Sequence, residues 1–167
     1  LCKKYGIPLY KFLGGYKTSL TTDLTIVNDT VEQMVEKSLK AIMDGYTCLK
    51  VKVGNHVDFD IEKIKAVRKA VRRGIKIRVD ANQGWRPKEA VSIIRKFEDL
   101  GLDIEFVEQP VNAWDIDGLK YVTDNVSTKI LADEAVFGPS DAFKIIEKRA
   151  ADLISRSEEH TSELQSP

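Results

Sequence analysis

The stretch TCLKVKVG, residues 47–54, shows the pattern that decides the fold. Apolar residues at every second position alternate with Lys50 and Lys52, and this period of two is typical of a β-strand. Both lysines are therefore predicted to lie on one face of the strand. Two interpretations are open for this stretch alone: a face turned to solvent, or a face that lines a site in which a lysine has a shifted pKa.

The same arrangement of residues recurs along the chain. A short apolar strand is followed by turn residues, an amphipathic helix, and a glycine or polar break. The predicted strands cover residues 22–27, 48–53, 76–79, 104–107 and 129–132, with the start of a sixth at 152–154. The predicted helices cover residues 31–44, 58–73, 87–100, 116–125 and 140–148. This alternation predicts an α/β fold with a parallel sheet, and periodicity alone leaves open whether the sheet closes into a (β/α)8 barrel or is doubly wound.

Turn and cap residues support these boundaries. Asp29 or Thr30 is predicted to cap the first helix. Gly45, Gly74 and Gly101 stand where helix C-caps are expected. A glycine-rich dinucleotide fingerprint follows none of the predicted strands.

The bulk composition narrows the classes of function. The 167 residues include 26 Lys and Arg and 26 Asp and Glu, and this zero net charge speaks against nucleic acid or a membrane surface as a partner. No apolar run approaches the roughly 18–20 residues that cross a bilayer. The two cysteines, Cys2 and Cys48, fit a reducing compartment, so we expect a cytoplasmic protein. Because the chain does not begin with methionine, we expect it to be a fragment of a longer protein.

The candidate site follows from the carboxyl ends of the predicted strands. Four consecutive units contribute polar residues there: Lys50 and Lys52, Asp80, Glu108, and Asp133. The successive steps from Lys52 onward are 28, 28 and 25 residues, one βα unit each. Since the carboxyl ends of parallel strands share one edge of a sheet, these side chains are predicted to lie together.

The chemistry of this set indicates a metal site. Each residue alone has an ordinary interpretation as a turn or cap residue. Three carboxylates crowded at one rim repel each other and lose solvation unless a cation neutralises them, and an all-oxygen ligand set suits Mg²⁺. A lysine beside that cation and a second lysine has a lowered pKa, which makes it a base near neutral pH. The joint pattern therefore favours the second interpretation of the lysine pair.

With these residues the chain resembles the enolase superfamily, in its muconate-lactonizing subgroup. The motifs that carry the resemblance are KVK (Lys50, Lys52), DAN (Asp80, Asn82), EQP (Glu108) and DE (Asp133, Glu134). The resemblance covers residues 1–154, and TTDLTI at residues 21–26 looks most like dipeptide epimerases of the L-Ala-D/L-Glu type. It implies a partial (β/α)8-type barrel, with strands one to five and the start of strand six. Residues 1–16 would then end a mostly missing capping domain, and residues 17–154 would form the barrel.

The resemblance also implies a mechanism. Mg²⁺ would be held by Asp80, Glu108 and Asp133. Lys52 would remove the proton α to a substrate carboxylate through an enediolate intermediate, and Lys50 would tune the pKa of Lys52.

Further roles and partners are implied in the same way. Thr25 would contact the substrate, and Asn82 and Glu134 would orient groups around the metal. The substrate would be a small carboxylate, a dipeptide by the closest likeness, and the whole protein would be a homo-oligomer. Two further activities of the superfamily stay open, muconate cycloisomerase and o-succinylbenzoate synthase, as does a non-catalytic barrel remnant. An alternative from another functional class is a receiver-like signalling domain with an acidic Mg²⁺ pocket and a lysine. The KVK strand speaks against this alternative, because such a domain does not need it.

The end of the chain departs from the family. Epimerisation needs a second acid/base, a lysine expected near position 157, where Ser157 stands. The residues RSEEHTSELQSP, 156–167, match one reading frame of a sequencing-library adapter, so we interpret residues 155–167 as a non-native tail. A genuine disordered tail is the alternative. We expect the fragment alone to be inactive, whereas its parent would be an isomerase.

Overall fold

One parallel sheet organises the chain in the computed structural model, which describes residues 2–54 and 57–155. Its strands are β1 (Leu24–Ile26), β2 (Cys48–Lys52), β3 (Lys76–Asp80), β4 (Ile104–Glu108), β5 (Lys129–Ala132) and β6 (Leu153–Ile154). The helices are α1 (Cys2–Tyr5), α2 (Leu9–Phe12), α3 (Val31–Met43), α4 (Val57–Ala70), α5 (Pro87–Asp99), α6 (Ile116–Asn125) and α7 (Pro139–Lys148). The strand order in the sheet is β1-β2-β3-β4-β5-β6, so every strand pairs with the one before it in the chain.

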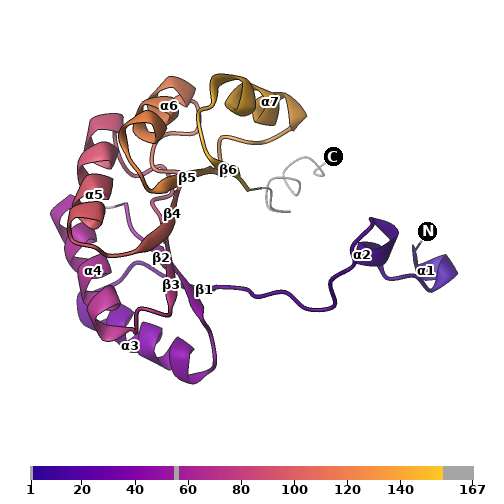
Figure 1. Ribbon diagram of the computed structural model, residues 1–167, viewed down its shortest axis with the longest axis horizontal. Helices are drawn as coiled ribbons and strands as arrows, with labels where there is room; N and C mark the ends of the chain where they lie inside the picture. Colours follow the sequence, from indigo (N-terminus) through magenta and orange to yellow (C-terminus); the bar gives the residue numbers. More distant parts are fainter. Residues whose placement is uncertain (1, 55–56, 156–167) are drawn as a thin grey trace.

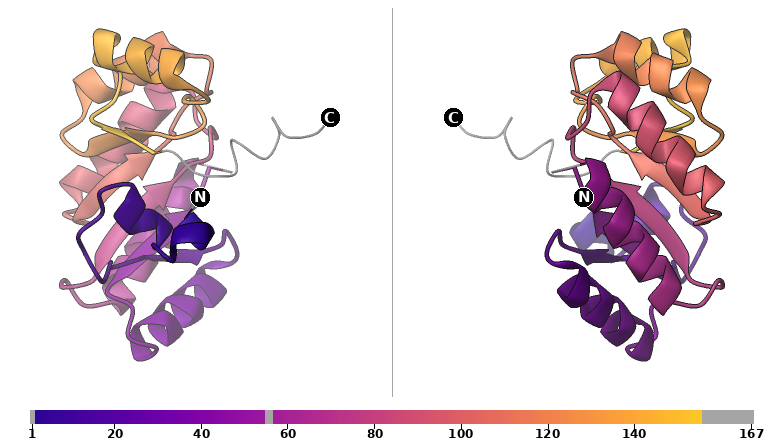
Figure 2. Two further views of the ribbon diagram at one scale, coloured as in Figure 1. Left: turned by 90° about the vertical axis from the view of Figure 1, so that its right-hand side faces the viewer. Right: turned by 90° about the vertical axis from the view of Figure 1, so that its left-hand side faces the viewer.

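The helices form a layer on one side of the curved sheet. Figure 1 shows α3 to α7 against its convex face, whereas α1 and α2 lie on the opposite side, beyond an extended segment that leads to β1. Figure 2 looks at the sheet from its two faces: α1 and α2 lie in front in the left view, and the helical layer faces the viewer in the right view. This arrangement is part of a (β/α) barrel, and it confirms the predicted fold class.

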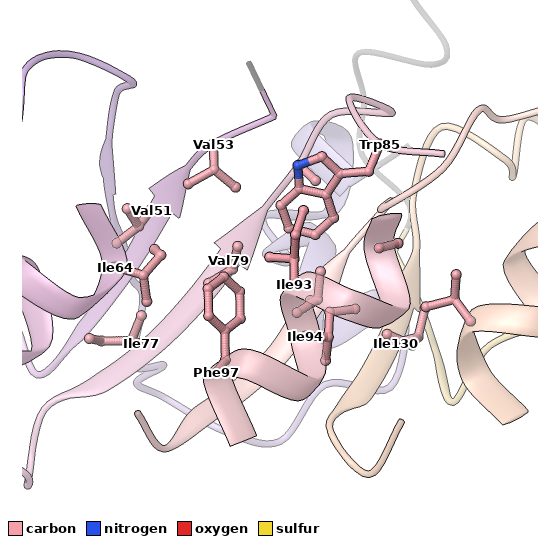
Figure 3. Close-up of a cluster of buried hydrophobic side chains, with 14 of the residues drawn as sticks. Val51, Val53, Ile64, Ile77, Val79, Trp85, Ile93, Ile94, Phe97 and Ile130 are labelled. Carbon is pink, nitrogen blue, oxygen red and sulfur yellow. The ribbon is translucent and has the colours of Figure 1, made fainter. Parts of the chain in front are cut away.

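The hydrophobic core lies between the helices and the sheet (Figure 3). Val51 and Val79 point from neighbouring strands toward this layer, where Ile64 of α4 and Ile93 and Phe97 of α5 pack. All five side chains are at most 1% exposed. Alternate strand residues therefore face the helices, which leaves the lysines and carboxylates of β2, β3 and β4 for the concave face.

Most predicted boundaries agree with the structure, but the end of α4 differs. Thr30 caps α3 by accepting a hydrogen bond from the backbone N–H of Gln33, and Gly45 and Gly101 have positive φ angles of 95° and 60°. The prediction that Gly74 caps α4 is wrong, because the helix ends three residues before the predicted Arg73.

The Arg68 guanidinium contacts the turn that follows this early end. It donates hydrogen bonds to the carbonyl oxygens of Arg72 and Ile75, at 3.4 and 2.9 Å. A further difference is that α1 and α2 were not predicted. Across the described residues, no helix is both long and apolar enough to cross a bilayer.

Candidate active site

The strand register lines up the candidate residues across the sheet. Lys52, Asp80 and Glu108 are Cα partners at the carboxyl ends of β2, β3 and β4. Thr25 of β1 is the Cα partner of Lys50, two residues before Lys52 in the chain. Parallel pairing therefore supplies one chemical group from each βα unit at nearly the same height.

Lys50 joins two of the carboxylates directly. Its Nζ lies 3.0 Å from Asp80 Oδ2 and 2.9 Å from Glu108 Oε1. Asp80 and Glu108 are only 1% and 5% exposed, so water does little to screen the pair. One ammonium group is thus shared by two buried carboxylates from neighbouring strands.

This sharing sets the electrostatics of the site. Burial lowers the pKa of Lys50, but the hydrogen bond to Glu108 and the charge of Asp80 outweigh burial, so the pKa is raised. Burial, together with the charges of Asp80 and Asp133, raises the pKa of Glu108 to about 7 despite the hydrogen bond from Lys50. The expected lowering of a lysine pKa concerned a lysine beside a bound cation; in the chain on its own carboxylates face Lys50, and its pKa is raised.

Lys52 belongs to a second set of contacts that spans three units. Its Nζ donates a hydrogen bond to Asn82 Oδ1 at 3.0 Å, and Asn82 Nδ2 donates to Glu134 Oε1 at 3.1 Å. The same Nζ lies 3.7 Å from Asp80 Oδ2. With a side chain that is 37% exposed, against 21% for Lys50, Lys52 is the more accessible of the two lysines.

Asp133 follows β5, and its charge contributes to the raised pKa of Glu108. Over residues 2–54 and 57–155, however, no three His, Cys, Asp or Glu side chains are arranged to hold a metal ion. Asp80 and Glu108 instead point to the Lys50 ammonium. The donor chemistry fits a hard cation such as Mg²⁺, since all three candidate ligands are carboxylates.

Comparison with known proteins identifies the family. Residues 33–158 match the family described as enolase C-terminal domain-like. The chain belongs to this family. The finding confirms the superfamily predicted from the KVK, DAN, EQP and DE motifs.

Relatives of this enolase-type domain include named epimerases. This chain is 49% identical over 153 residues to the L-Ala-D/L-Glu epimerase of Clostridium acetobutylicum, and the match covers 92% of this chain and 43% of the relative. Identity to the L-Ala-D/L-Glu epimerase of Bacillus subtilis is 50% over 151 residues, covering 90% of this chain and 41% of that protein. The chain thus spans less than half the length of these curated relatives.

Solved structures agree in fold. A substrate-liganded complex of the Bacillus subtilis L-Ala-D/L-Glu epimerase superposes with a TM-score of 0.90 at 49% identity, covering 92% of this chain and 43% of that one. The Enterococcus faecalis dipeptide epimerase complexed with Mg and the dipeptide L-Leu-L-Tyr gives a TM-score of 0.87 at 44% identity, covering 91% and 42%. The enolase-type domain therefore corresponds to part of a longer architecture.

Sequence reasoning missed one residue of the site region and made two predictions that lie outside the described residues. In the EQP motif only Glu108 was assigned a role, yet the next residue, Gln109, is fully buried and its side chain makes three hydrogen bonds. The signal was an uncharged polar residue directly after a buried strand. Position 157, expected for the second lysine, and the adapter-like tail from residue 156 lie outside the described residues.

Proposed function

We propose that the whole protein containing this enolase-type domain is a Mg²⁺-dependent epimerase that acts on dipeptides. The observation that carries the proposal is the position of Lys52, whose Nζ lies 3.7 Å from the buried Asp80 carboxylate, on strands whose register places Lys52, Asp80 and Glu108 in one row. A Lys base beside an acidic, cation-binding rim is suited to removing a proton α to a carboxylate.

The metal would be held by Asp80, Glu108 and Asp133. Burial first, and then the charges of Asp80 and Asp133, disfavour the ionised Glu108, and a bound cation would offset both effects. When bound, Mg²⁺ would neutralise the negative charge that develops on the substrate carboxylate.

Lys52 would perform the proton transfer on one face of the substrate. The Lys52 Nζ donates a hydrogen bond to Asn82 Oδ1, which directs the amine toward the concave side of the sheet. Loss of the α-proton to Lys52 gives an enediolate, and a second acid/base on the opposite side of the substrate, supplied by the rest of the whole protein, would return a proton to the other face and invert the stereocentre. Lys50, kept protonated by its two carboxylate partners, would act by its charge and not as the base.

The dipeptide class rests on the relatives. Two of them are named L-Ala-D/L-Glu epimerases, and a third, from Enterococcus faecalis, is named hydrophobic dipeptide epimerase and is 44% identical over 153 residues. Thr25 is exposed on β1 beside Lys50, where we propose that it contacts the substrate.

A hybrid protein tests the proposal. The 151-residue aligned segment of the Bacillus subtilis relative is replaced by the matching segment of this chain. In D₂O, NMR should show incorporation of deuterium at the α-carbon of the Glu residue in L-Ala-L-Glu, in the presence of Mg²⁺ and not in EDTA. Lys52→Ala in the hybrid should lower epimerisation by at least about 100-fold, the lower limit for loss of a general base.

Lys129→Ala is the matched control, because Lys129 is exposed at the opposite, amino end of β5. We expect this variant to keep the activity of the hybrid. A folded hybrid that binds Mg²⁺ but exchanges no α-proton would contradict the proposed activity. Equal activity of the Lys52→Ala variant would contradict the assignment of the base.

A further inference from the structure

The buried side chain of Gln109 connects two loops at the carboxyl edge of the sheet. Its Oε1 accepts hydrogen bonds from the backbone N–H groups of Asp133 and Ala135, at 3.0 and 3.1 Å. Its Nε2 donates to the carbonyl oxygen of Val111 at 2.9 Å. Gln109 is 0% exposed, so these bonds form away from competing water.

The backbone of Gln109 makes further connections. Its N–H donates to the carbonyl oxygen of Leu131 at 2.8 Å, and its carbonyl oxygen accepts from the N–H of Gln83 at 2.8 Å. The residue has a φ angle of 34°, in the sparsely populated left-handed region. A strained conformation that is fully buried and fully hydrogen-bonded is over-determined by its surroundings, which is the situation found at functional sites.

The two amides that Gln109 binds belong to the loop that carries Asp133. Gln109 itself follows Glu108 directly in the chain. The side chain therefore spans the gap between two candidate metal ligands that stand on neighbouring strands, β4 and β5.

We propose that Gln109 is a positioning residue that holds the Asp133 loop against the end of β4 and so sets the spacing between the Glu108 and Asp133 carboxylates. The metal part of this inference rests on the proposed function. Groups that orient metal ligands typically contribute 10–100-fold to metal affinity. A glutamine suits this position because it accepts from two amides at one end and donates to a carbonyl at the other, without adding a charge.

Mn²⁺ binding to the full chain, followed by electron paramagnetic resonance, tests the metal part. Mn²⁺ prefers the same oxygen ligands as Mg²⁺. Gln109→Met keeps the length of the side chain and removes its hydrogen bonds, so the Kd for Mn²⁺ should rise about tenfold or more. The matched control is Gln83→Met, which removes one hydrogen bond, from the N–H of Ala113 to Gln83 Oε1. The control should leave the Kd within about twofold.

Gln109→Glu separates positioning from general stability. It keeps an acceptor oxygen for the Asp133 and Ala135 amides but replaces the donor that faces the Val111 carbonyl. We expect this variant to lose thermal stability yet to bind Mn²⁺ more tightly than Gln109→Met does. A residue with a merely structural role would lose both properties in parallel.

Amide hydrogen exchange, measured by NMR without metal, tests the loop directly. Gln109→Met should speed exchange of the Asp133 and Ala135 amides at least about tenfold, with amides of β2 unchanged. Unchanged exchange at both amides would overturn the proposal, as would Mn²⁺ affinity that is unaffected by Gln109→Met. If the unaltered chain binds no Mn²⁺, the proposed metal site fails, and faster exchange in Gln109→Met would still establish that Gln109 holds the loop.

Discussion

Lys50 carries the positive charge that makes the acidic rim compatible with a folded chain. Its ammonium lies within 3.0 Å of oxygens on both Asp80 and Glu108. Without this ammonium, the two buried carboxylates beside it would repel each other. Lys50 thus neutralises the two carboxylates, as a bound cation would also do. The Lys50 ammonium and a cation would therefore compete for the same carboxylate oxygens.

This competition gives a prediction for Lys50→Met. Removing one partner of a buried ion pair costs about 3–5 kcal/mol, so the variant should be less stable without metal, by up to about 3 kcal/mol because Lys50 is partly exposed. The melting temperature should then rise on addition of Mg²⁺ by more than it does for the unaltered chain. Differential scanning calorimetry with and without Mg²⁺ measures both effects.

Lys129→Met serves as the control for Lys50→Met, since Lys129 is exposed at the far end of β5. Its response to Mg²⁺ should equal that of the unaltered chain. If Lys50→Met gains no extra stabilisation from Mg²⁺, the ammonium does not compete with a cation.

At the scale of elements, the turns after β2 and β3 pack against each other through two glycines. Gly54 has a φ angle of 109°, and a Cβ on it would overlap the carbonyl oxygen of Ala81. A Cβ on Gly84 would overlap the backbone of Gly54. Asp60 Oδ2 holds the same contact by accepting hydrogen bonds from Gly54 N and Trp85 Nε1, both at 3.0 Å.

Gly54→Ala should therefore be strongly destabilising. Backbone strain costs about 1–3 kcal/mol and overpacking about 1–3 kcal/mol, so the free energy of unfolding should fall by at least about 2 kcal/mol. Gly74→Ala is the control, because no atom lies within 4 Å of the added Cβ and φ is not positive there. Urea denaturation of the two variants decides this, and equal stability would show that the two turns separate freely.

Arg78 of β3 links Glu105 of β4 to Asp23, the residue before β1, toward the opposite, amino end of the sheet. It donates to Glu105 Oε2 at 2.6 Å and to Asp23 Oδ2 at 2.8 Å. Burial alone would raise the pKa of Glu105. The hydrogen bonds from Lys76 and Arg78 outweigh burial, so the pKa lies below its ordinary value of 4.5. The unfolded chain binds this proton more readily, so Glu105 stabilises the fold above about pH 4.5, and this contribution is lost as the pH falls through the folded pKa.

Glu105→Gln should remove that contribution. We expect a loss of about 1 kcal/mol at pH 7, the scale of partly exposed ion pairs, and a smaller fall in stability between pH 5 and pH 3 than in the unaltered chain. Thermal melts followed by circular dichroism across this pH range give the comparison, with the exposed Glu147→Gln as control. An unchanged acid profile for Glu105→Gln would mean that other carboxyl groups cause the acid loss.

The main elements could be predicted because local signals agreed with the final packing. Residues 129–132 and 116–125 form the predicted strand and helix with the same bounds, since their apolar faces are those that the core buries. The cap at Gly74 was predicted wrongly because α4 ends at Ala70, and the segment after it is bound by Arg68, which also donates to the distant Leu102 carbonyl, a contact that local sequence signals do not show. Helices α1 and α2 are four residues each and bury no side chain, so no apolar periodicity marks them.

The placement of the candidate residues was predictable, and their electrostatic detail was not. The steps from Lys52 to Asp80 and from Asp80 to Glu108 each equal one βα unit, and the register makes successive residues neighbours. The direction of the Lys50 pKa and the role of Gln109 depend on which atoms touch, and spacing carries no information about contacts.

For the whole molecule, the open sheet is the dominant feature. Among the described residues, β1 and β6 each pair with a single neighbour, so each leaves one edge unpaired. Large apolar side chains of the segment before β1, such as Tyr16 and Leu20, are also exposed. Unpaired edges and exposed apolar surface favour association between chains.

We predict that the 167-residue chain self-associates at micromolar concentration, by edge pairing at β6. Ile154→Lys places a charge on this edge and should raise the monomer fraction seen by size-exclusion chromatography with light scattering. Ile146→Lys on α7 makes the same chemical change away from the edge and should leave association as it is. Equal association in all three chains would exclude edge pairing as the cause.

The strand order has a consequence for biosynthesis. A nascent chain leaves the ribosome from its amino end, and each strand of this sheet needs only the strand already made before it. The sheet can therefore grow vectorially, one βα unit at a time, without waiting for a distant partner to be translated. Ribosome-bound chains stalled after successive helices would carry protease-resistant cores that lengthen by one unit at each step.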